Sequence, residues 1–99
     1  MWEIGGSGGQ SERMFRGLPL RYSDSTNVHL AIEKILPETL YDMISHPVNC
    51  PENAPKPHRR TAIRICAERR GRLFVIMLER DYTNDIHDDA YVVTHLKPI

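Results

Sequence analysis

The sequence lacks the long apolar stretches that place a protein in a membrane. No run approaches the roughly 20 apolar residues of a membrane-spanning helix, and residues 1–10 lack the basic start and apolar centre of a signal peptide. The chain has 99 residues, which suffices for one domain with a modest core. We therefore expect a soluble single domain that makes no contact with a membrane.

Cysteine is scarce, with Cys50 in a proline-rich stretch and Cys66 in a predicted strand. Two cysteines form no disulfide framework, so a reducing compartment is the default, and a single bridge between them stays open. Together with His46 and His58 they supply zinc-ligand types, but the spacing matches no compact zinc pattern. The acidic residues 81–89 lack the central glycine and final glutamate of a calcium loop. We expect neither metal nor cofactor.

Common enzyme signatures are also missing. No GxSxG, HExxH, Walker glycine loop or GxGxxG stands between a strand and a helix, which argues against familiar hydrolases, zinc peptidases and nucleotide-binding domains. Only Phe74 and Tyr91 lie in the strands predicted below, too few for a base-stacking sheet surface.

The C-terminal forty residues predict three consecutive strands. Residues 61–68 alternate apolar and polar positions, as in a strand with one buried face. Residues 69–71 form a turn, and the run LFVIML within residues 72–79 is typical of a central strand covered on both faces. The third strand, residues 90–96, places Thr94 and His95 on opposite faces.

Two short helices precede these strands. Capping residues 24–26 stand before a predicted helix at 26–35, whose apolar stripe is Val28, Ala31, Ile32 and Ile35. Pro37 ends it and opens a second helix that closes at His46-Pro47, with the stripe Leu40, Met43 and Ile44. The sequence thus predicts an α+β fold, two helices on one face of a three- to four-stranded antiparallel meander sheet.

The remaining segments are connections. Residues 1–12 are rich in glycine and serine and predict a flexible linker or tag-like segment before one α+β domain at 13–99. Residues 14–22 predict a short extended segment that anchors on the core. Residues 48–58 contain three prolines and predict a long loop.

The net charge of zero conceals an uneven distribution. Residues 56–80 hold eight cations, seven of them arginine, against two acids, while residues 1–55 and 81–99 each carry a balance of −3. Arginine binds phosphate oxygens with a two-pronged fork. The alternative interpretation of this arginine-rich segment is a solvated hairpin edge without a binding role. The residues we expect to contact RNA are Lys34, Lys56, Arg59, Arg69, Arg70 and Arg72.

A chemically useful set remains among the other polar residues: His29 on the first helix, arginines near the first strand, and Thr94 and His95 on the last. A metal-independent ribonuclease needs a group that deprotonates the ribose 2′-hydroxyl, cations for the phosphorane, and an acid for the leaving 5′-oxygen. Imidazole suits both proton transfers.

The order of these features resembles the barnase, EndoU, colicin and RelE group of ribonucleases and toxins. The resemblance covers residues 22–99. It consists of a helix with an early histidine, a second helix ending near His-Pro, a basic strand, an apolar strand and a last strand reading YVVTHLKP. The resemblance implies catalytic roles for His29, for Arg60 or Arg64, and for Thr94. The sequence departs from the pattern of this group at Glu33, where relatives often carry a basic residue. Lys34 follows directly, and His95 is the candidate to replace the missing basic group.

These residues together predict a metal-independent endoribonuclease, the toxin or effector domain of a bacterial or phage protein, cleaving RNA by 2′-hydroxyl attack. The predicted catalytic residues are His29, Arg60, Arg64, Thr94 and His95. We expect RNA and a cognate immunity or antitoxin protein as partners, a monomer or weak dimer, and a cytoplasmic site of action, reached by delivery within a larger secreted protein. The alternatives are a non-catalytic module that binds nucleic acid or an acidic protein through its basic hairpin, and an oligomer formed through a free sheet edge.

Overall fold

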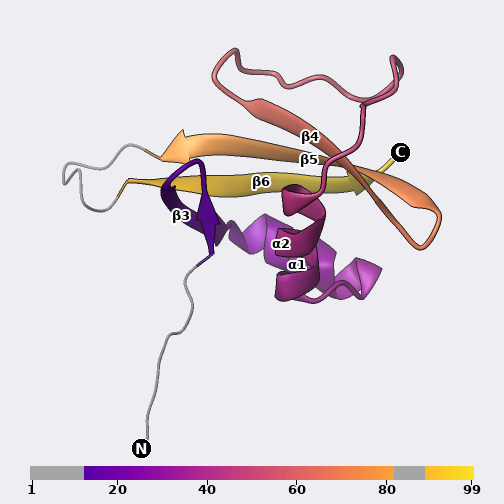
Figure 1. Cartoon of the computed structure of the whole chain (residues 1–99), viewed down its shortest axis with the longest axis horizontal. Helices are drawn as coiled ribbons and strands as arrows, with labels where there is room; N and C mark the ends of the chain where they lie inside the picture. The colour runs from indigo at the N-terminus through magenta and orange to yellow at the C-terminus, as the bar shows by residue number, and fades with distance from the viewer. Residues whose placement is uncertain (1–12, 82–88) are drawn as a thin grey trace, which may run out of the picture.

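The computed structural model describes residues 13–81 and 89–99, so the predicted linker at 1–12 and most of the acidic connection lie outside the described residues. Its elements, in order, are β2 (Met14–Phe15), β3 (Leu18–Tyr22), α1 (Asp24–Glu33), α2 (Pro37–Ser45), β4 (Ile63–Arg69), β5 (Arg72–Asp81) and β6 (Ala90–Pro98). The helices lie on one side of the sheet and the connection between α2 and β4 lies on the other (Figure 1).

The predicted α+β class is confirmed, whereas the prediction of a purely antiparallel meander sheet is wrong. The sheet has five strands in the order β2-β3-β6-β5-β4, and only β4, β5 and β6 form the predicted meander. The segment expected to be merely extended forms a hairpin, because Arg16 and Gly17 both adopt positive φ in a two-residue turn. Its second strand, β3, pairs in parallel with β6, which makes the sheet mixed.

The basic hairpin forms as predicted. Arg70 and Gly71 have φ of 52° and 77°, the left-handed conformations of a tight turn between twisted strands. Residues 74–78 of β5 are all buried, which confirms a central strand covered on both faces. On β4, Cys66 is fully buried on the face expected to be polar, because the chain before β4 covers it.

Two hydrophobic clusters lie on the two faces of β5. Phe74, Ile76 and Leu78 pack toward the helices, together with Leu30 of α1 and Leu40 of α2. The alternate residues Val75 and Met77 face the opposite way and form a smaller cluster with Ala54 and Cys66. Val75 and Met77 of this smaller cluster also line the candidate site.

The first helix lies differently from the prediction. It starts at Asp24, with the Ser23 hydroxyl accepting a hydrogen bond from the Thr26 amide, and Val28 and Ile32 are exposed by 58% and 64%. The inward face carries Leu30 and the fully buried Thr26, whose hydroxyl donates to the Val93 carbonyl at 2.7 Å. This buried hydrogen bond orients α1 and turns Val28, Ala31 and Ile32 toward solvent, whereas Ile35, the last residue of the predicted stripe, is buried after the helix end as expected.

The second helix matches its prediction. It begins with Pro37 at the first position, and Leu40, Met43 and Ile44 are its buried residues. None of the helices in residues 13–81 and 89–99 is both long enough and apolar enough to span a membrane.

Candidate active site

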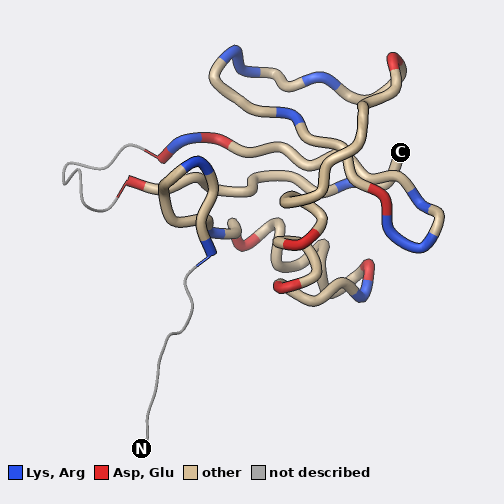
Figure 2. The backbone as a smooth tube through the Cα atoms, viewed as in Figure 1, with Lys and Arg blue, Asp and Glu red and all other residues tan. Residues whose placement is uncertain are grey.

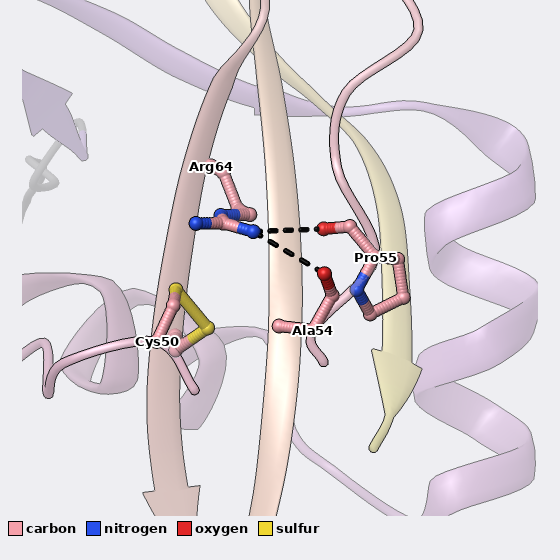
Figure 3. The surroundings of a disulfide bond; sticks show 5 residues. Cys50, Ala54, Pro55 and Arg64 are labelled. Atoms are coloured by element: carbon pink, nitrogen blue, oxygen red, sulfur yellow. Dashed lines mark hydrogen bonds between the residues drawn. A yellow bond between two sulfur atoms is a disulfide. The ribbon is translucent and has the colours of Figure 1, made fainter. Parts of the chain in front are cut away.

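The proline-rich loop, residues 46–62, is attached to β4 at three places. Cys50 and Cys66 form the single disulfide that the sequence left open, with a Cα–Cα distance of 5.2 Å (Figure 3). The Val48 amide donates to the Cys66 carbonyl at 2.8 Å. Nη1 of Arg64 donates to the carbonyls of Ala54 and Pro55 at 3.3 and 3.4 Å (Figure 3). A segment without regular structure is thereby held over the sheet.

The inner pocket lies between this loop and strands β5 and β6 and has a volume of about 260 Å³. Its floor includes the apolar Val75 and Met77. Its walls carry seven polar side chains from three segments of the chain: Lys56, His58, Arg59, Glu79, Thr94, His95 and Lys97.

An irregularity in β6 brings Thr94 and His95 into this pocket together. Met77 pairs with His95, but the next residue of β5, Leu78, pairs with Val93. Thr94 is the additional residue of a β-bulge, and bulges redirect side chains. The expectation that Thr94 and His95 lie on opposite faces is therefore wrong: both line the inner pocket, and the Thr94 hydroxyl lies 3.4 Å from the Met77 carbonyl that accepts from it.

The inner pocket is predominantly cationic. Glu79 is its one carboxylate among the described residues, and it accepts a hydrogen bond from Arg59 at 3.4 Å. Lys56 and Lys97 have no carboxylate partner within the described part of the chain. Together with two imidazoles, these cations suit a bound phosphate group.

His29 is not part of this pocket. Its Nδ1 lies 2.9 Å from the Ser25 carbonyl of the same helix. The helix belongs to the layer that packs on Ile76 through Leu30, whereas the pocket floor uses the alternate residues of β5 on the other face. The histidine that the resemblance makes catalytic is thus on the opposite side of the sheet from Thr94 and His95.

Arg60 and Arg64 line a second, wider hollow of about 540 Å³, here called the outer pocket. Lys56, His58 and Arg59 contribute to both pockets. The Ala62 amide donates to the Arg59 carbonyl at 3.1 Å, which closes a turn with Arg60 at its corner.

The remaining predicted RNA-binding residues form a separate group. Arg69, Arg70 and Arg72 lie at the β4–β5 hairpin turn, where Lys and Arg positions gather (Figure 2). Arg72 donates to Glu33 at 3.1 Å, and Lys34 follows Glu33 in the sequence. Seven residues of β4, about 20 Å of strand at 3.3 Å per residue, separate this end from residues 56–62, most of which line the pockets. Glu33, the departure from the family pattern, binds the hairpin to α1.

His58, Glu79 and Lys97 are site residues that the sequence did not single out. Lys97 was detectable, because it lies two residues after His95 and so shares its strand face. His58 stands in a loop without periodicity, where no pattern predicts a direction for its side chain. The comparisons return no match: neither a family model, nor a curated protein, nor a solved structure.

Proposed function

We propose that the chain is a metal-independent ribonuclease whose reacting centre is the inner pocket. The observation that carries this proposal is the meeting of two imidazoles, His58 and His95, with Thr94 and three cationic side chains in one hollow. A phosphodiester needs this combination when no metal ion neutralises its charge.

In the proposed reaction, one imidazole accepts the proton of the ribose 2′-hydroxyl. The 2′-oxygen then bonds to phosphorus while the bond from phosphorus to the 5′-oxygen breaks. The second imidazole, in its protonated form, donates a proton to the leaving 5′-oxygen. The products are a 2′,3′-cyclic phosphate and a free 5′-hydroxyl, and the two imidazoles have exchanged protonation states.

His58 and His95 fit these roles because imidazole exchanges protons near neutral pH and can act either as a base or as an acid. Both side chains are exposed enough to reach a substrate. Glu79 is the other candidate base, but its carboxylate already accepts from Arg59, which it holds over the pocket. We therefore give Glu79 a positioning role.

The other polar groups would bind the phosphorane. Arg59, Lys56 and Lys97 supply positive charge to its non-bridging oxygens, and the Thr94 hydroxyl can donate to one of them in place of the Met77 carbonyl. The resemblance to the barnase, EndoU, colicin and RelE group favours the same reaction class, but of the catalytic residues that it implies only Thr94 lies in the inner pocket. Under this proposal, that group's immunity or antitoxin partner would cover the inner pocket.

The direct test of this function uses a DNA oligonucleotide with one ribonucleotide at a known position. We expect cleavage only after that ribose, a 2′,3′-cyclic phosphate end, and an unchanged rate in EDTA. Cleavage of the all-DNA strand, or loss of activity on chelation, would contradict 2′-hydroxyl attack without metal.

A non-catalytic interaction module is the second candidate. The observation that favours it is the separate basic group at the hairpin turn, which lies away from both pockets. Binding that weakens steeply with salt, without cleavage of any RNA, would support this candidate.

A further inference from the structure

We infer that the outer pocket binds a second phosphate of the RNA chain, so that the substrate is a single strand of several nucleotides. This inference rests on the proposed function. It assigns a ligand to a hollow that the reaction at the inner pocket does not use.

The two pockets share one wall. Residues 56–59 face the inner pocket on one flank and the outer pocket on the other, and they place Lys56, His58 and Arg59 within reach of both. A strand whose reacting phosphodiester lies in the inner pocket can cross this segment, so that a neighbouring phosphate enters the outer pocket.

The lining of the outer pocket favours an anion. Apart from Pro57, it consists of four cationic side chains and one imidazole, and no carboxylate lines it within the described residues. An anion bound through Arg60 and Arg64 therefore replaces water and leaves the ion pair of Arg59 with Glu79 in place.

Arg60 and Arg64 offer donors to such an anion. Arg60 is exposed at the corner of its turn and has no ion-pair partner among residues 13–81 and 89–99. Arg64 uses Nη1 for the loop carbonyls, and its other guanidinium N–H groups stay available, since a guanidinium carries five. Two arginines can bind one phosphate through forked hydrogen bonds.

A flexible single strand fits this arrangement better than a duplex. The phosphates must pass along residues 56–59 from one pocket to the other, and the bases must be free to turn away from this segment. A stiff A-form helix presents its phosphates on a regular surface that cannot bend over one loop segment. Single strands follow cationic grooves with little dependence on sequence.

The test compares kcat/KM for a dinucleoside monophosphate and for a ten-nucleotide RNA with the same cleavage site. In the wild-type protein we expect a higher kcat/KM for the longer substrate. Arg60→Glu should lower the ratio of the two values about tenfold, and Arg60→Ala should reduce the salt slope of binding by about 0.7. Arg16→Asp reverses the same charge at the β2–β3 turn, outside both pockets and at a positive φ that Asp tolerates, and should leave the ratio unchanged.

An equal fall of the ratio in Arg60→Glu and Arg16→Asp, or no fall in either, would overturn the inference while leaving ribonuclease activity intact. A wild-type protein that cleaves neither substrate would refute the proposed function instead. Binding of a ten-nucleotide DNA strand then tests the outer pocket alone, and binding unaffected by Arg60→Glu refutes it. Equally tight, Arg60-dependent binding of a ten-residue glutamate peptide would refute the assignment to nucleic acid.

Discussion

Reduction of the Cys50–Cys66 disulfide should destabilise the protein and loosen the wall between the two pockets. The bridge joins residues that are 16 positions apart and fixes the proline-rich loop to β4. In the reduced protein, the loop keeps the Arg64 hydrogen bonds, the Val48 bridge, the ion pair of Arg59 with Glu79 and the burial of Ala54.

The expected size follows from the closed loop. A cross-link spanning about 15 residues removes roughly 3 kcal/mol of chain entropy from the unfolded state. For a domain of this size, 1 kcal/mol shifts Tm by roughly 4–8 °C, so reduction should lower Tm by roughly 12–24 °C.

The assay is thermal unfolding followed by circular dichroism, with and without a phosphine reductant. The double variant Cys50→Ala/Cys66→Ala is the control, and its Tm should be low and independent of the reductant. Exchange of the Val48 and Ala54 amides, which donate to the carbonyls of Cys66 and Pro51, should accelerate on reduction. A wild-type Tm that changes by less than about 3 °C would refute the view that the bridge fixes this loop.

Three further predictions concern single side chains. Burial raises the pKa of Tyr22 to about 12, whereas unfolded tyrosine titrates near 10. The stabilisation that comes from this shift is therefore complete below pH 10 and is lost as pH rises toward 12. In urea unfolding, the free energy of unfolding of Tyr22→Phe should fall less over that pH interval than that of the wild type. Thr26→Val removes the hydrogen bond to the Val93 carbonyl, which still accepts from the Ser23 amide. The free energy of unfolding measured in urea should fall by about 1 kcal/mol, and Thr26→Ser should stay close to wild type. Arg64→Met should accelerate exchange of the Ala54 amide with the disulfide intact, because Arg64 holds the Ala54 and Pro55 carbonyls, and unchanged exchange would contradict the anchoring role.

Much of the sheet was predictable because its signals are local. The continuous apolar run of β5 requires cover on both faces, and Arg70-Gly71 between two strands specifies a tight turn. Likewise, Pro37 at the first position and the stripe that follows it define α2.

The site was less predictable because its arrangement depends on non-local contacts. A β-bulge depends on the register with the partner strand, so the sequence gives no reason for Thr94 and His95 to share a face. The orientation of α1 depends on the buried hydrogen bond from Thr26 to Val93, 67 residues away. His58 reaches the sheet only because the loop before it is fixed to β4.

The parallel pairing of β3 with β6 was also hard to predict, because it too depends on non-local contacts. Residues 18–22 carry no signal for their partner, which is more than sixty residues later in the sequence. The two basic groups also depend on the tertiary structure, since β4 separates residues that the charge count places in one segment.

The measurement that tests the central claim most directly is the rate of RNA cleavage by His95→Ala compared with His29→Ala. The two histidines lie on opposite faces of the sheet, and both side chains contact solvent, so either replacement should leave Tm nearly unchanged. Removal of a proton-transferring group lowers the rate by about 10²–10⁴. We predict that loss for His95→Ala and a wild-type rate for His29→Ala. The reverse result, activity lost with His29 and retained without His95, would contradict the assignment of the reacting centre to the inner pocket.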